Sequence, residues 1–237
     1  MVEVKGWKKY ARYAVFSTDD PSGRYVILSF WIILIIGVFP YFVNGPWGLF
    51  VFSLLVSFVM IAAVFSITGR SKYAIIALIL IIPALILAWT SLIIDSKDIL
   101  IISKFLSLIV LTLVTFSIFL EVIRSKSPIP RHIIWGAIAV YLLIGLSFAI
   151  LFNLTSLITP GSFVYGLNPS AELDFPDFVY FSYVTLATLG YGDIVPTTAQ
   201  ARSFAILEAI TGSLYLAILI AKIVSLSLAS PEIMQRK

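Results

Sequence analysis

The sequence predicts an all-α membrane protein with six transmembrane helices, and three observations support this. Of the 237 residues, 60% are hydrophobic and 12% are charged, whereas soluble domains average about 45–50% apolar and about 25% charged residues. The apolar residues also gather in nearly charge-free runs close to the ~20 residues that cross a ~30 Å hydrocarbon core. Finally, the apolar stretch between the last two runs, Phe175–Leu189, is too short to be another ordinary span.

Composition excludes several classes of function. The chain has no cysteine and a single histidine, His132, so disulfides, thiolate metal sites and histidine-rich metal sites are excluded. The 12 acidic residues lie mostly in loops, which argues against a carboxylate-based active site. We therefore expect neither an enzyme nor an organic cofactor. The net charge of +4 does not indicate a nucleic-acid partner, since basic residues in a membrane protein are topology signals.

The apolar runs divide the chain into units. In order, they cover 25–43, 48–68, 73–94, 99–120, 133–153 and 199–229. The expected domains are an amphipathic N-terminal segment over 1–24, a four-helix transmembrane bundle over 25–121, a linker over 122–131, a C-terminal unit over 132–230 and a short tail over 231–237. Within the C-terminal unit, an outer helix is expected over 132–153 and an inner helix over 199–229.

Basic residues predict the orientation of the chain. If the N-terminus is cytoplasmic, twelve of the 16 Lys and Arg residues fall on cytoplasmic segments, as the positive-inside rule requires. They are Lys5, Lys8, Lys9, Arg12, Arg24, Arg70, Lys72, Arg124, Lys126, Arg131, Arg236 and Lys237. Both termini are therefore expected to be cytoplasmic.

The first four basic residues carry a second hypothesis. Lys5, Lys8, Lys9 and Arg12 share one face of a helix and Trp7 lies on the other, which suits a helix lying in the membrane interface. Membrane lipid is then an expected partner, with anionic lipid contributing about 1 kcal/mol per basic residue. The alternative is that these charges only hold the N-terminus on the cytoplasmic side.

The segment between the fifth and sixth runs is the informative one. Phe175–Leu189 is too short to span the bilayer, so a re-entrant helix is predicted at about 176–187, followed by Thr-Leu-Gly-Tyr-Gly-Asp over 188–193. Non-helical backbone at membrane depth is tolerated only inside protein or beside a water-filled cavity. Gly190 and Gly192 can adopt positive φ at little cost, so successive carbonyls can point the same way. Four such strands around one axis would stack oxygen rings that replace the hydration shell of a monovalent cation.

This segment resembles the pore of the tetrameric potassium channels, whose filter signature reads Thr-Val-Gly-Tyr-Gly. Leu189 replaces the signature valine and Ala187 stands where many members have a second threonine. The resemblance implies a homotetramer with K⁺ ions in the filter. It also implies that Thr188, Leu189, Gly190 and Tyr191 supply the ion-coordinating oxygens, while Gly192 and Asp193 shape the outer mouth.

The resemblance extends over roughly 131–230, in the manner of prokaryotic two-helix ion-channel domains. Tyr180 and Phe181 fall where the family carries an aromatic pair that packs around the filter, and Gly212 falls where it keeps a hinge glycine in the inner helix. A prokaryotic plasma membrane is the location that this resemblance implies. Helical spacing from Gly212 adds a stripe expected to line the inner pore: Ser213, Leu216, Ile220 and Val224.

The first four spans occupy the position of a voltage sensor, but their charge is insufficient for one. The fourth span, 99–120, contains one basic residue, Lys104. One charge moved through 100 mV yields about 2.3 kcal/mol, and roughly 3–4 charges per subunit are needed. Gating by an arginine-based sensor is therefore not expected. The bundle is then a scaffold or, alternatively, a sensor of lipid, tension or a ligand, and the short linker favours packing beside its own pore unit.

Glu208 is the only acid deep inside a span. An intramembrane carboxylate indicates a functional role by default, so Glu208 either tunes the filter or makes a buried structural hydrogen bond. The function expected from the whole pattern is passive K⁺-selective conduction. Two alternatives stay open, namely a weakly selective cation channel and a non-conducting sensor or potassium-transporter subunit on a pore-like scaffold.

Overall fold

A computed structural model describes residues 21–38, 48–69, 73–94, 96–125, 131–166 and 172–228. The described chain is helical apart from one short strand pair, as the composition predicted. Its elements are α2 (Pro21–Val38), α3 (Gly48–Ile67), α4 (Ala74–Thr90), α5 (Lys97–Arg124), α6 (Arg131–Ile158), β1 (Phe163–Tyr165), α7 (Phe175–Leu186), β2 (Ile194–Pro196) and α8 (Ala199–Leu228). The predicted N-terminal helix with Lys5, Lys8, Lys9 and Arg12 lies outside the described residues.

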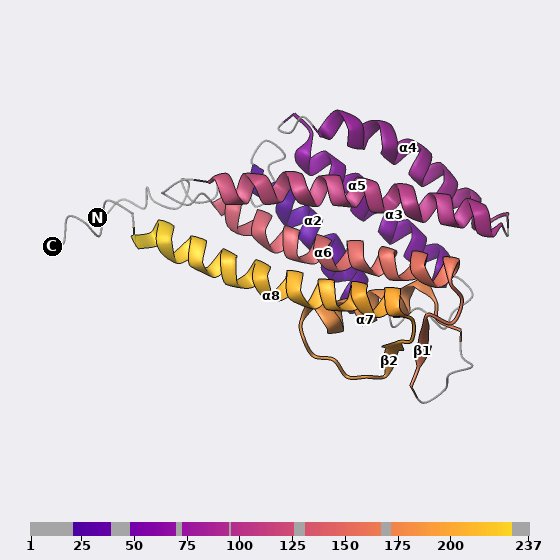
Figure 1. Cartoon of the computed structure of the whole chain (residues 1–237). Helices are drawn as coiled ribbons and strands as arrows, with labels where there is room; N and C mark the ends of the chain where they lie inside the picture. Colours follow the sequence, from indigo (N-terminus) through magenta and orange to yellow (C-terminus); the bar gives the residue numbers. More distant parts are fainter. Residues whose placement is uncertain are drawn as a thin grey trace, which may run out of the picture.

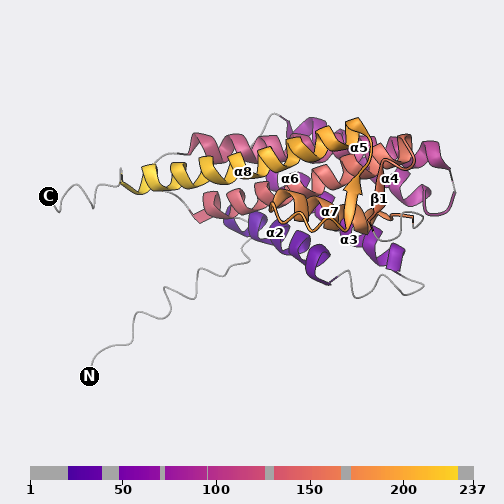
Figure 2. The same ribbon diagram turned by 60° about the horizontal axis from the view of Figure 1, so that its bottom comes forward.

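The six longer helices run side by side along one direction, and α7 lies against them at the end that carries the two strands (Figure 1, Figure 2). The most extensive packing joins α5 to α6, α4 to α5, α6 to α7 and α2 to α6. Since α2 and α5 both pack on α6 of the same chain, the bundle lies beside its own C-terminal unit, as the short linker predicted.

Four of the described helices, α3, α5, α6 and α8, are long and apolar enough to cross a membrane. The protein is therefore an integral membrane protein. Helix α2 has 18 residues and α4 has 17, so at ~1.5 Å per residue both are shorter than a ~30 Å core requires. Residues 39–47 and 70–72, which flank them, lie outside the described part, and six crossings stay a prediction.

Three predicted boundaries were wrong. Helix α2 begins at Pro21, inside the predicted N-terminal segment, because proline is tolerated in the first turn of a helix. Helix α5 runs to Arg124, so the linker is shorter than predicted. Helix α6 continues five residues beyond 153, because the Thr155 hydroxyl donates to the carbonyl of Leu151 at 2.8 Å and need not face water. It ends before Gly161, whose φ is +79°.

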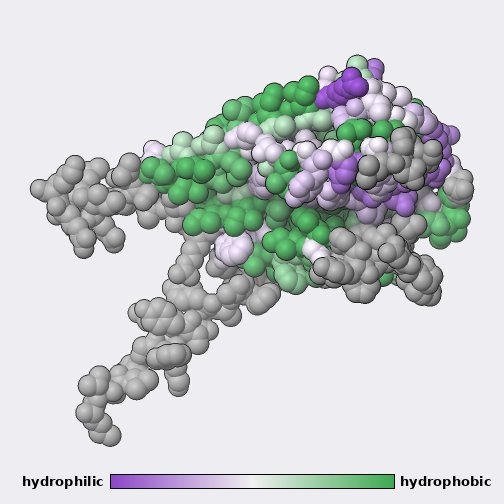
Figure 3. Space-filling view, turned by 90° about the horizontal axis from the view of Figure 1, so that it is seen from below, coloured by the Kyte–Doolittle hydropathy of each residue, from purple (hydrophilic) through white to green (hydrophobic). Residues whose placement is uncertain are grey.

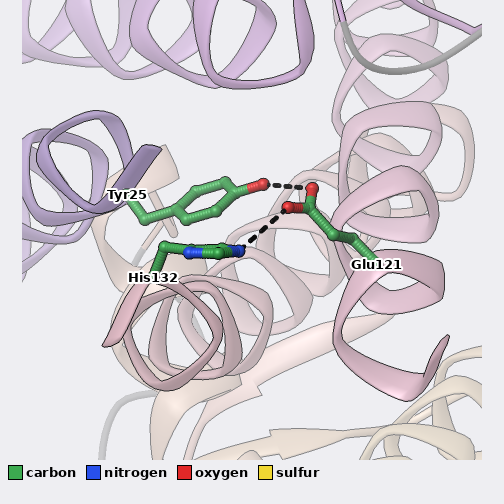
Figure 4. Close-up of polar contacts among 3 residues, drawn as sticks. All are labelled: Tyr25, Glu121 and His132. Carbon is green, nitrogen blue, oxygen red and sulfur yellow. Dashed lines mark hydrogen bonds and ion pairs between the residues drawn. The ribbon is translucent and has the colours of Figure 1, made fainter. Parts of the chain in front are cut away.

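Polar contacts join the helices at the end opposite the strands. The Arg24 guanidinium donates to the carbonyl of Thr68 at 3.2 Å, which satisfies an orphan acceptor at the C-terminal end of α3. The Tyr25 hydroxyl donates to Glu121 Oε2 at 2.6 Å, and His132 Nε2 lies 3.8 Å from Glu121 Oε1 (Figure 4). These three side chains connect the start of α2, the end of α5 and the start of α6.

Candidate functional site

Helix α7 is the element from which the site is built. It spans Phe175–Leu186, one residue earlier at each end than predicted. Its first turn is fixed by Asp177, whose two carboxylate oxygens accept from the Asp174 amide and the Tyr165 hydroxyl, both at 2.7 Å. Asp174 and Asp177 lie at the positive end of the helix dipole.

Burial and neighbouring carboxylates change the pKa values of two groups at the start of α7, Asp174 and Tyr165. Burial raises the pKa of Asp174, and repulsion from Asp177 and Glu172 raises it further. Burial and the hydrogen bond to Asp177 raise the pKa of Tyr165, so its phenol stays protonated and remains the donor in that bond. Lowering the pH through the titration of Asp174 relieves the repulsion and therefore favours the folded state.

The segment Thr188–Asp193, called the Gly-Tyr-Gly segment below, has an alternating backbone. The φ angles are +57° at Thr188, +58° at Gly190 and +76° at Gly192. Positive φ was predicted at the two glycines, but not at Thr188, where a non-glycine residue in this region costs roughly 1–2 kcal/mol. Positive φ at every second residue is the alternation that allows successive carbonyls to face the same side of a strand.

The Gly-Tyr-Gly segment is held at both ends and open between them. At its start, the Leu189 amide donates to the carbonyl of Val184 in α7 at 2.9 Å. At its end, Asp193 accepts from the Tyr180 hydroxyl at 2.6 Å and from the Ile194 amide at 3.0 Å. Every residue from 187 to 193 is exposed in the single chain, so this chain alone does not cover the segment.

The two residues of the predicted aromatic pair, Tyr180 and Phe181, make different contacts. Tyr180 reaches the Gly-Tyr-Gly segment through its bond to Asp193, whereas Phe181 is buried behind α7, edge-on to Phe152 at 5.0 Å and to Phe163 at 5.4 Å between ring centroids. Because Phe163 starts β1, which pairs antiparallel with β2 in the register Phe163↔Pro196, this cluster connects α7 to the chain just beyond the segment. Phe152 and Phe163 were missed by the sequence analysis.

Two glycines allow the long helices to approach α7. A Cβ at Gly212 of α8 would lie 2.7 Å from the carbonyl oxygen of Leu186, and a Cβ at Gly145 of α6 would lie 2.5 Å from a ring carbon of Tyr183. Gly212 was predicted as a hinge, and the structure gives it a packing role as well. Gly145 was missed, although a glycine in the middle of an apolar span is a recognisable signal.

Glu208 of α8 is fully buried at 0% exposure. Its Oε1 lies 2.5 Å from the Ser182 Oγ of α7, and that same Oγ lies 2.6 Å from the carbonyl oxygen of Gly145 in α6. Glu208 thus makes a buried hydrogen bond to α7, which is one of the two roles that the sequence left open. Ser182 was not singled out from the sequence, because a serine in an apolar helix gives no sign of its partner.

Comparison with known proteins finds a likeness in the C-terminal part of the chain. Residues 133–228 match a family model described as an ion channel. A stretch of 64 residues is 44% identical to Two-pore potassium channel 4 of Arabidopsis thaliana, covering 26% of this chain and 22% of that protein. Residues 133–228 are therefore similar to a family of ion channels, and part of the chain is similar to a known potassium channel.

Two further potassium channels are similar to this chain over short stretches. Two pore potassium channel c of Oryza sativa subsp. japonica is 39% identical over 66 residues, or 28% of this chain and 14% of that protein. Potassium channel K1 of Plasmodium berghei (strain Anka) is 33% identical over 88 residues, or 35% of this chain and 4% of that protein. The chain thus spans less than a quarter of the length of each of these relatives.

Helix α8 turns most of its apolar surface away from its own chain. Only 17% of the apolar stretch Ala199–Ser225 of α8 is buried. Its packing on α6 includes Tyr215, whose hydroxyl donates to the carbonyl of Ala137 at 2.6 Å. The surface over the long helices is mostly hydrophobic, and polar residues gather toward the end with the strands (Figure 3). The stripe predicted to line the inner pore lies on the uncovered side, with all four residues exposed: Ser213, Leu216, Ile220 and Val224.

Lys104 makes the contact between α5 and α7. Its Nζ lies 3.5 Å from the ring centroid of Phe175, the first residue of α7, and the Phe52 ring of α3 packs edge-on to the same ring at 5.3 Å. The Lys104 amine thus packs over the Phe175 ring and joins the bundle to the start of α7.

Proposed function

We propose that this protein is a potassium-selective channel in which ions pass between four copies of the Gly-Tyr-Gly segment. The observation that supports this best is the positive φ at every second residue from Thr188 to Gly192. A backbone of this kind carries a row of carbonyl oxygens on one side. Such rings of oxygens replace the hydration shell of K⁺ in potassium channels.

In this proposal each residue of the segment has a defined task. Thr188, Leu189, Gly190 and Tyr191 supply the oxygens that coordinate K⁺, which is the transported ion, and Gly192 and Asp193 shape the outer mouth. Substitution of leucine for valine at the second position is tolerated, because coordination uses the carbonyl rather than the side chain. The C-terminal end of α7 directs its partial negative charge toward the ion path.

A homotetramer in the membrane follows from the same reasoning. One chain contributes one strand, so four chains are needed to close rings of oxygens. The exposed residues of α8 favour this arrangement, since they include large apolar side chains such as Ile210, Leu214 and Ile220, at 50%, 55% and 62% exposure. Membrane lipid is the remaining partner. The cytoplasmic location of both termini stays a proposal, supported by the distribution of basic residues.

The reversal potential tests the proposal. Purified protein in a planar bilayer, with K⁺ on one side and Na⁺ on the other, is expected to reverse far from zero toward the K⁺ equilibrium potential. A reversal near zero would instead indicate a weakly selective cation channel. A stable monomer or dimer that carries no current would indicate a non-conducting sensor or transporter subunit.

The Lys104→Gln variant tests whether gating uses a charged sensor. We expect the voltage dependence of the current to stay within error of the wild type, because one charge supplies about 2.3 kcal/mol per 100 mV, a fraction of what roughly 3–4 charges provide. Conductance–voltage curves of both proteins are the measurement. A steep voltage dependence in the wild type that vanishes in the variant would contradict the expectation.

A further inference from the structure

The polar chain that connects α6, α7 and α8 contains one hydroxyl between two oxygens. Ser182 Oγ lies 2.6 Å from the Gly145 carbonyl oxygen and 2.5 Å from Glu208 Oε1. A serine hydroxyl has one hydrogen to donate. The backbone carbonyl has none, so one hydrogen on Ser182 cannot serve both short contacts.

The burial of both side chains supports the presence of a second hydrogen in this pair of contacts. Ser182 and Glu208 are each 0% exposed, and Glu208 Oε2 has no hydrogen-bond partner among the described residues. No ion pair between Glu208 and a basic side chain occurs within the described part of the chain. A buried carboxylate with one oxygen unpartnered and no counter-charge is strongly unfavourable, whereas an unpartnered neutral carbonyl costs far less.

From this geometry we infer that Glu208 is a neutral carboxylic acid that donates its proton to Ser182 and thereby positions the Gly-Tyr-Gly segment. Glu208 Oε1 carries the hydrogen and donates to Ser182 Oγ, and the Ser182 hydroxyl donates to the Gly145 carbonyl. Each short contact then has its own hydrogen. The chain of two bonds fixes the middle of α7 to α8 on one side and to α6 on the other.

The position of this chain explains why it matters to the segment. Ser182 lies six residues before Thr188 on α7, whose C-terminal turn also holds the Leu189 amide through the Val184 carbonyl. Glu208 lies one turn before Gly212, the residue that touches the carbonyl of Leu186. Glu208 is thus a positioning residue, which rests on the proposed function only for its effect on ion passage.

Infrared spectroscopy of the purified full-length protein tests the protonation directly. In mildly alkaline buffer, the wild type is expected to show the carbonyl stretching band of a buried protonated carboxylic acid, and the Glu208→Gln variant is expected to lose it. Glu121→Gln is the matched control, because Glu121 accepts from Tyr25 at the far end of the helices, and it should keep the band. A spectrum in this region that is unchanged in Glu208→Gln would overturn the inference.

Comparing the Glu208→Gln and Glu208→Ala variants distinguishes a neutral, donating Glu208 from an ionised one. Glu208→Gln keeps a donating amide at the same place, so we expect it to retain the melting temperature and the K⁺ reversal potential of the wild type. Glu208→Ala removes the donor, so we expect a lower melting temperature and a reversal potential that is shifted toward zero. If Glu208→Gln fails as completely as Glu208→Ala, an ionised Glu208 is required and the inference is wrong. Because the infrared band does not depend on conduction, failure of the proposed function would leave this test intact.

Discussion

The Gly190→Ala variant is expected to lose K⁺ current while still assembling and melting much like the wild type. Gly190 has a φ of +58°, and no atom of the chain lies within 4 Å of the position of an added Cβ. The substitution therefore creates no clash within the chain, but it penalises the left-handed backbone by roughly 1–2 kcal/mol per chain. The strand relieves this strain by rotating its peptides, which turns carbonyls away from the ion path.

Gly161→Ala is the matched control for this experiment. Gly161 has a φ of +79° and also has no atom within 4 Å of an added Cβ, so the backbone penalty is the same in kind. It lies in the turn before β1, away from the Gly-Tyr-Gly segment. We expect Gly161→Ala to keep its current in bilayer recordings. Equal loss of current in both variants would show that general strain, not carbonyl direction, explains the effect of Gly190→Ala.

The sequence predicted the helices of the C-terminal unit closely, because local signals define them. Proline and two acids mark the start of α7, the first glycine of the Gly-Tyr-Gly segment follows its end, and α8 is a long uninterrupted apolar run. The prediction failed where tertiary contact decides. Thr155 continues α6 because its hydroxyl finds an acceptor within the helix, and a polar residue by itself does not reveal that choice.

The backbone conformation of the site could be predicted largely from the sequence. The side-chain contacts that hold the site in place could not. Glycines indicate positions where φ can be positive, whereas nothing in the local sequence indicates the positive φ of Thr188. The partners of Glu208 depend on how three helices are rotated about their axes, which a single sequence does not specify. The same is true of Lys104 and Phe175, which are far apart in the sequence and yet lie in contact.

The Gly212→Ala variant is expected to be destabilised by about 1–3 kcal/mol, the usual cost of overpacking a close contact. The added methyl group would lie 2.7 Å from the Leu186 carbonyl oxygen and 2.8 Å from its Cδ1. A side chain can rotate away, but the backbone oxygen moves only if α7 and α8 separate. Thermal melting in detergent is the measurement, and we expect a lower melting temperature.

Gly37→Ala provides the comparison that separates packing from a hinge. Gly37 is also a helical glycine, in α2, but nothing lies within 4 Å of its added Cβ, so alanine there is expected to be neutral or stabilising by up to about 1 kcal/mol. A hinge at Gly212 would alter channel opening while the melting temperature stays at the wild-type value. A packing glycine lowers the melting temperature and displaces the end of α7, two residues before Thr188. If Gly212→Ala melts like Gly37→Ala, the close approach of α8 to α7 is not maintained in the folded protein, and the hinge becomes the better account.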